Sequence, residues 1–96
     1  MFAVVGCVRI MPGQEDQTRQ MISDHGVDMF RGMAGSRNAY WSRVADGADL
    51  LQHSFWVFDT EENARSAQTT FNALREMPDA PAEWVSCEVC EVIGEA

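Results

Sequence analysis

Residues 2–11 read FAVVGCVRIM, and the pattern of this stretch decides the fold. A strand that is covered on one side only alternates apolar and polar residues. This stretch is apolar on both alternating sets of positions: Phe2, Val4 and Val8 fall on one set, and Ala3, Val5 and Cys7 on the other. We therefore predict a strand that is buried on both of its faces.

Three more strands and two helices are predicted around this first strand. Pro12 and Gly13 end it, because proline cannot donate to a strand ladder. The helices are expected over residues 14–31 and from Asp59 to a point before Pro78, and the other strands over residues 37–44, 50–58 and 84–93. The order β-α-β-β-α-β is that of the ferredoxin-like split βαβ fold, an α+β class with an antiparallel sheet and both helices on one face. We expect a single domain over residues 1–96.

The third strand repeats the pattern of the first. One set of alternating positions holds Leu51, His53, Phe55 and Val57, and the other holds Gln52, Ser54, Trp56 and Phe58. Two helices cover only one face of such a sheet, and a large exposed apolar patch is rare on a soluble monomer. The sequence therefore predicts a homodimer, a dimeric α/β barrel in which the second faces of two sheets pack about a two-fold axis.

The hairpin between the second and third strands determines which side chains share a face. With Asp46-Gly47 at the centre of an even-numbered turn, Trp41 lies opposite Gln52 and Tyr40 lies opposite His53. The face toward the helices then holds Trp41, Ser54 and Trp56, and the face toward the partner subunit holds Tyr40, His53 and Phe55. A bulge or a three-residue loop would exchange Tyr40 with Trp41, because a one-residue slip flips every side chain.

The first helix carries an apolar stripe in which Ile22, His25, Met29 and Met33 recur at helical spacing. Gly26 within this helix costs about 1 kcal/mol relative to alanine, so a bend or break is expected there. His25 should face the sheet, either as a general base toward a phenolic ligand or as a hydrogen-bonded core histidine. A small apolar or aromatic ligand is expected to contact Trp41, Ser54, Trp56, Met29 and Ile22.

Composition limits the partners and the compartment. Fifteen acidic and seven basic residues give a net charge of −8, whose field repels nucleic-acid phosphates and anionic lipid surfaces. No apolar run approaches the roughly 20 residues of a membrane-spanning helix, so neither nucleic acid nor membrane is an expected partner. Three cysteines fit the reducing cytoplasm. Cys87 and Cys90 form a CxxC, but a strand sends these side chains to opposite faces, so no metal site is predicted.

Several motifs together resemble the antibiotic biosynthesis monooxygenase family. They are Pro12-Gly13 before an acidic helix, Gly35 before an aromatic strand, the Asp46-Gly47 hairpin, and Trp56 before the helix start Asp59-Thr-Glu-Glu-Asn-Ala64. The resemblance spans nearly the whole chain and implies a homodimeric ferredoxin-like barrel with a ligand cavity between each sheet and its own helices. The chain departs from the family pattern where Trp56-Val57-Phe58 replaces Trp-Glu-Ser and Ala34-Gly35-Ser36 replaces Pro-Gly-Phe.

The resemblance implies a cofactor-independent monooxygenase that acts on a small aromatic substrate, such as a phenol, a quinol or a polyketide. Whether the chain is an enzyme stays open, because one fold hosts many chemistries. One alternative is a non-catalytic, small-molecule-binding or stress-responsive dimer. Another is an isomerase or decarboxylase of a small cyclic acid, which needs Arg9 or Arg43 to turn inward. Haem degradation is disfavoured, because that branch has an asparagine on strand one and a histidine on the second helix, and this chain has neither there.

Overall fold

The computed structural model describes residues 1–77 and 80–96 of the chain. The strands are β1 (Phe2–Ile10), β2 (Ser36–Asp46), β3 (Asp49–Phe58) and β4 (Ala82–Glu91). The helices are α1 (Glu15–Met21), the π-helical turn η1 (Ile22–Gly26), α2 (Val27–Arg31), α3 (Glu61–Ala73) and the 3₁₀ turn η2 (Leu74–Glu76). The predicted element order is confirmed, and Pro78, the expected stop of the second helix, lies outside the described residues.

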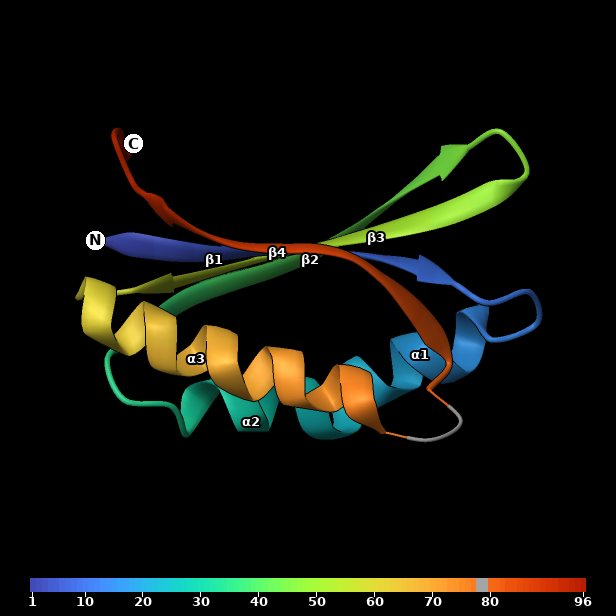
Figure 1. Ribbon diagram of the computed structural model, residues 1–96, viewed down its shortest axis with the longest axis horizontal. Coiled ribbons are helices and arrows are strands. Elements are labelled where there is room, and N and C mark those ends of the chain that lie inside the picture. The colour runs from blue at the N-terminus through green and yellow to red at the C-terminus, as the bar shows by residue number, and fades with distance from the viewer. Residues whose placement is uncertain (78–79) are drawn as a thin grey trace.

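The four strands form one antiparallel sheet in the order β2-β3-β1-β4, which leaves β2 and β4 at its edges. Figure 1 shows all the helices on one side of this sheet and none on the other. This arrangement confirms the ferredoxin-like α+β fold. No helix in the described part of the chain has the length and apolar character needed to cross a membrane.

The predicted hairpin register is wrong by two residues, although the predicted faces are right. The turn is Gly47-Ala48, so Asp46 pairs with Asp49 and Trp41 pairs with Ser54 rather than with Gln52. Tyr40 pairs with Phe55 rather than with His53. Side chains alternate with a period of two, so a two-residue error leaves every side chain on its predicted face.

The first turn of α3 is fixed by a cap and by the loop that precedes β2. Thr60, one residue after the expected Asp59, is the N-cap, and its hydroxyl accepts a hydrogen bond from the Asn63 backbone N–H at 3.1 Å. The Asp59 carboxylate instead accepts from the Asn63 side-chain amide at 2.8 Å. Gly35 packs beside both side chains with a φ of +72°, a conformation and a space that only glycine fits. These contacts attach the start of α3 to the start of β2.

The core lies between the helices and the sheet face that carries Val4, Trp56 and Phe58, all of them almost fully buried. The helix α3 packs Ala64, Ala67 and Phe71 against this face, as its apolar stripe predicts. Gly6 at the centre of β1 lets α3 approach closely. A Cβ atom at this position would lie 2.7 Å from Ser54 Oγ and 2.8 Å from Phe71 Cζ.

We expect Gly6→Ala to lower the free energy of unfolding by about 1–3 kcal/mol, because the added methyl must displace Ser54 or Phe71 in a packed core. Gly26→Ala is the matched control. Its Cβ would meet its nearest neighbours at 3.8 Å, so the better helix propensity of alanine should raise stability by up to about 1 kcal/mol. Urea unfolding at one fixed protein concentration measures both changes. Equal stability of the two variants would contradict this account of the core.

Candidate functional site

An aromatic layer occupies the space between the sheet and the helices. Its centre is Trp56 on β3, which is 2% exposed. The ring of Phe71 on α3 packs edge-on against Trp56 with 5.3 Å between centroids, and Trp41 on β2 lies 6.0 Å away on the other side. Phe30 on α2 closes the layer at 5.8 Å. The predicted placement of Trp41 and Trp56 on the helix-facing side is therefore confirmed.

Trp84 on β4 joins this layer, although the sequence analysis did not assign it to the site. Its ring lies 4.9 Å from that of Phe71. A bulge in β4 pairs Val8 with Trp84 and Cys7 with Ser86, which leaves Val85 as the extra residue. The bulge places both Trp84 and Cys87 against the core. Without it, their three-residue separation would send them to opposite faces.

The layer contains two buried indole N–H groups. The Nε1 atoms of Trp56 and Trp84 are both buried, and neither has a hydrogen-bond partner among the described residues. Buried N–H donors in folded proteins are nearly always paired with protein, water or ligand. The two tryptophans pack on the same phenyl ring of Phe71.

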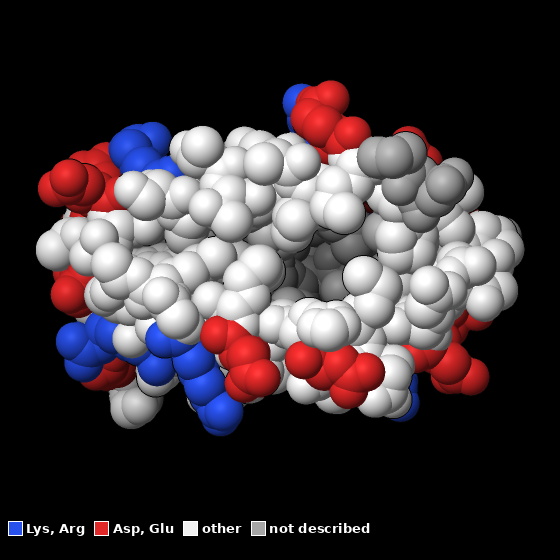
Figure 2. Space-filling view, turned by 90° about the horizontal axis from the view of Figure 1, so that it is seen from below, with Lys and Arg blue, Asp and Glu red and all other residues white. Residues whose placement is uncertain are grey.

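The helix side of the molecule is hollowed between its helical segments (Figure 2). Figure 2 shows a deep opening between the two helical segments, and the atoms at its rim belong to uncharged residues. Ser54, 5% exposed on β3, shares the sheet face beneath, where it pairs with Gly6 and Trp41. Met29, half-buried, packs against the aromatic layer. Ser54 and Met29 therefore lie where the sequence analysis placed them.

The expectation that His25 faces the sheet is wrong, because His25 is exposed to solvent. The π-helical turn Ile22–Gly26 widens the helix at this point. The side that meets the sheet follows Thr18, Ile22, Gly26 and Phe30, and Gly26 lies in van der Waals reach of the Trp41 ring. The predicted irregularity at Gly26 is thus a wide turn in a continuous helix. His25 therefore does not reach the aromatic layer and is not a base there.

A second concave region lies between α1 and the free edge of β2. It is a cleft of about 600 Å³ lined by Arg19, Ile22, Ser23, Gln52 and the β2 residues from Ala39 to Arg43. Ile22 therefore lines this cleft rather than the centre of the aromatic layer. Trp41 belongs to both regions, because it lines the cleft and also packs on Trp56.

Arg43 connects the cleft to α1 through three hydrogen bonds to neutral acceptors. It donates to the Glu15 carbonyl at 2.9 Å, to Thr18 Oγ1 at 2.6 Å and to Gln52 Oε1 at 3.0 Å. Burial lowers the pKa of Arg43 below its ordinary value, and the nearby charge of Arg19 lowers it further, while Glu15 and Asp16 act in the opposite direction. The guanidinium is thus held rigidly on the helix side of the sheet.

The cysteines carry no reactive arrangement. Cys87 faces the core opposite Gly6, while Cys90 pairs with Ala3 on the other side of the sheet, as the strand geometry predicted. Burial raises the pKa of the Cys87 thiol, which lowers its thiolate fraction at neutral pH. Within residues 1–77 and 80–96, no three His, Cys, Asp or Glu side chains are grouped so as to hold a metal ion.

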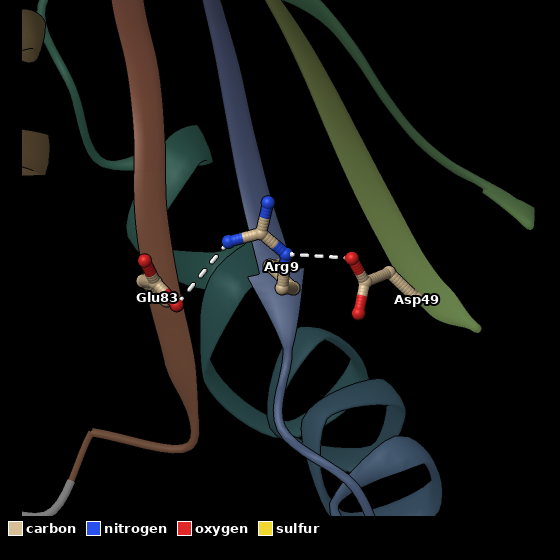
Figure 3. A network of polar contacts seen from close by, with 3 residues as sticks. All are labelled: Arg9, Asp49 and Glu83. Carbon is tan, nitrogen blue, oxygen red and sulfur yellow. Dashed lines mark hydrogen bonds and ion pairs between the residues drawn. The ribbon is translucent and has the colours of Figure 1, made fainter. Parts of the chain in front are cut away.

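The other face of the sheet carries the residues that were predicted to meet a partner subunit. Tyr40 is 69% exposed, Phe55 is 43% exposed, and His53 is half-buried on the same face. We call this surface the open face. At one end of it, Arg9 on β1 pairs with Asp49 on β3 and Glu83 on β4, each at 3.2 Å (Figure 3). Its cationic charge is therefore neutralised on the open face and does not reach the aromatic layer.

Comparison with solved structures identifies the fold. A variant of MhuD with two manganese protoporphyrin IX molecules bound per active site matches with a TM-score of 0.68 at 11% identity, covering 100% of this chain and 98% of that one. The monooxygenase from the gene ActVA-Orf6 of Streptomyces coelicolor, in complex with nanaomycin D, matches with a TM-score of 0.60 at 17% identity, covering 99% and 89%.

A candidate antibiotic biosynthesis monooxygenase from Chloroflexus aurantiacus J-10-fl matches equally well, with a TM-score of 0.60 at 17% identity and coverage of 99% and 96%. No protein-family model and no curated protein sequence matches the chain. The fold of this chain is therefore that of the antibiotic biosynthesis monooxygenases, as the sequence motifs indicated.

We expect Thr18→Val to lower the free energy of unfolding by about 1–2 kcal/mol, because a half-buried guanidinium N–H of Arg43 loses its acceptor. Thr69→Val is the matched control on α3. Its hydroxyl contacts only the Arg65 carbonyl, at 3.1 Å, in an exposed position, so its effect should stay within about 0.5 kcal/mol. Chemical denaturation of both variants measures the difference. An equal loss of unfolding free energy in Thr18→Val and Thr69→Val would show that Arg43 does not attach α1 to the sheet.

Proposed function

We propose that the chain binds a small aromatic molecule in the hollow beneath its helices and oxygenates it without a cofactor. The observation that carries this proposal is the buried aromatic layer with two indole N–H donors, on Trp56 and Trp84, that lack acceptors within the described part of the chain. Such a layer offers flat apolar contact and two polar anchors, which is the composition of a small-molecule site. A monooxygenase with this fold was crystallised with nanaomycin D, which supports a ligand of this class.

In the proposed reaction the substrate supplies the electrons. A phenol or quinol loses a proton to solvent, and its carbanion-like form reacts with dioxygen at a CH₂ or CH carbon. One oxygen atom enters the product and the other leaves as water, so a CH₂ group becomes a carbonyl and a dihydroxynaphthalene, oxidised at an aromatic CH, becomes a hydroxynaphthoquinone. The indole N–H of Trp56 donates to the phenolate oxygen and so favours the ionised substrate, and the indole N–H of Trp84 donates to a second oxygen of the ligand. Ser54 and Met29 contribute to a pocket that excludes water.

The open face supports a homodimer. Its exposed apolar side chains are Tyr40, Phe55, Val44 and Val85, and no described residue packs over them. A patch of this kind is typical of an interface. A second copy of the chain, packed with its own open face on this one, gives a closed two-fold pair in which Tyr40, His53 and Phe55 are buried. The free cysteines fit the cytoplasm, which we propose as the location.

A second candidate function, an isomerase or decarboxylase of a small cyclic acid, is favoured by the placement of Arg43. This reaction needs a cation on the helix side of the sheet to hold the acid. Arg43 is held there, whereas Arg9 lies on the open face. A non-catalytic binding dimer would share the ligand site and the interface but would not turn over either kind of substrate.

We expect oxygen consumption with anthrone or with dihydroxynaphthalenes as substrates, at a rate well above that without protein. Trp56→Phe keeps an aromatic side chain but replaces the indole by a smaller phenyl ring without the N–H, so kcat should fall about tenfold or more. His25→Ala is the control and should match the wild type, since His25 is exposed. An oxygen electrode gives the rates. If no substrate of this panel is consumed faster than in buffer, or if Trp56→Phe is fully active, the oxygenase proposal fails.

We expect Phe55→Glu to convert the dimer to a monomer at micromolar concentration, because the proposed contact would bury an unpaired carboxylate. Met21→Glu provides a matched control, since Met21 on α1 is also 43% exposed but lies away from the open face. Size-exclusion chromatography with light scattering reads the mass. Identical masses for Phe55→Glu, Met21→Glu and the wild type would argue against this interface.

A further inference from the structure

The cleft between α1 and the edge of β2 holds two arginines whose charges are not neutralised by contact. Among the described residues, no carboxylate lies within 4.0 Å of Arg19 or Arg43. Arg65 on α3 lines another surface depression, but it is ion-paired with Glu61 at 2.8 Å. Arg19 and Arg43 therefore differ from Arg65 in having no ion-pair partner among the described residues.

Two neighbouring cations repel each other, and this is an unusual arrangement in a chain with a net charge of −8. Arg43 is fixed by three neutral acceptors, so its position does not depend on a carboxylate. The carboxylates that act on it, those of Glu15 and Asp16, lie on α1 beyond ion-pair distance. A guanidinium has five N–H donors, and the three bonds to neutral acceptors leave two of them free for an anion.

The rest of the cleft is aromatic and neutral. Trp41 supplies a ring and Ser23 a hydroxyl group, while Tyr40 and Ser42 border the cleft from the open face. Trp41 also contacts Trp56, so the cleft adjoins the aromatic layer. A ligand whose ring lies on Trp41 can therefore place an acidic group toward the two arginines. The overall negative charge of the protein opposes a doubly charged phosphate more than a singly charged carboxylate.

We propose that this cleft binds the carboxylate of an aromatic acid, with Arg43 as the fixed anchor, Arg19 as the second cation and Trp41 as the stacking surface. The site goes beyond the proposed oxygenation and does not depend on it, because binding of an acid requires no turnover. If a second copy covers the open face, Arg43 and Arg19 stay accessible, because Arg43 lies on the helix side of the sheet and bonds to α1.

The test compares 1-naphthoate with its uncharged analogue 1-naphthamide by isothermal titration calorimetry on the full chain. We expect the naphthoate to bind about tenfold or more tightly than the amide, and its affinity to fall as salt is raised. Arg19→Gln should weaken naphthoate about three- to fivefold, since this side chain is exposed. Arg43→Lys should weaken it about tenfold, because an ammonium lacks the planar fork. Arg31→Gln, on α2 outside the cleft, is the control and should bind like the wild type.

Two-dimensional ¹H–¹⁵N spectra locate the binding, and naphthoate should shift the indole N–H signal of Trp41. Equal affinity for naphthoate and naphthamide, or equal losses in Arg19→Gln and Arg31→Gln, would overturn the proposal. Tighter binding of 1-naphthyl phosphate than of naphthoate would overturn its assignment to carboxylates. Failure of the oxygen-consumption assay would leave naphthoate binding intact, so the two proposals fail separately.

Discussion

The constraint on which this structure depends is a four-stranded sheet that is apolar on both faces. One face is covered from within the chain, because α3 and the α1–α2 segment pack on Val4, Trp56 and Phe58. The other face carries exposed Tyr40 and Phe55 and has no layer over it within the described chain. Burial of apolar surface is the main favourable term in folding and association. The same hydrophobic pattern therefore leads to the core on one side and to the proposed dimer on the other.

The candidate site follows from how the covered face is packed. Gly6 lets Phe71 approach the sheet, and Phe71 in turn separates Trp56 from Trp84. The rings pack on one another, but their geometry leaves two indole N–H groups without acceptors among the described residues. A core of aliphatic side chains would contain no such donors. The proposed binding site is thus a consequence of building this core from tryptophan.

Much of the fold was predictable, because the face on which a strand side chain lies depends only on whether its position is odd or even. Trp41, Ser54 and Trp56 were assigned to the correct face from a register that was wrong by two residues, since only odd shifts exchange the faces. The helix was less predictable. The π-helical turn Ile22–Gly26 rotates the side chains that follow it relative to a regular α-helix, and no residue pattern around Gly26 indicates such a turn. His25 was therefore predicted to face the sheet, whereas it is exposed. Trp84 was missed for the related reason that a bulge in β4 is not visible in the alternation.

The central claim is that the open face of one chain is buried by the open face of another. An isotope-filtered nuclear Overhauser experiment on an equimolar mixture of ¹³C-labelled and unlabelled chains tests it most directly. The account predicts intermolecular signals between the side chains of Tyr40, Phe55 and Val44 in one copy and the same surface of the other. Intermolecular signals confined to the helices, or none at all at millimolar concentration, would contradict it.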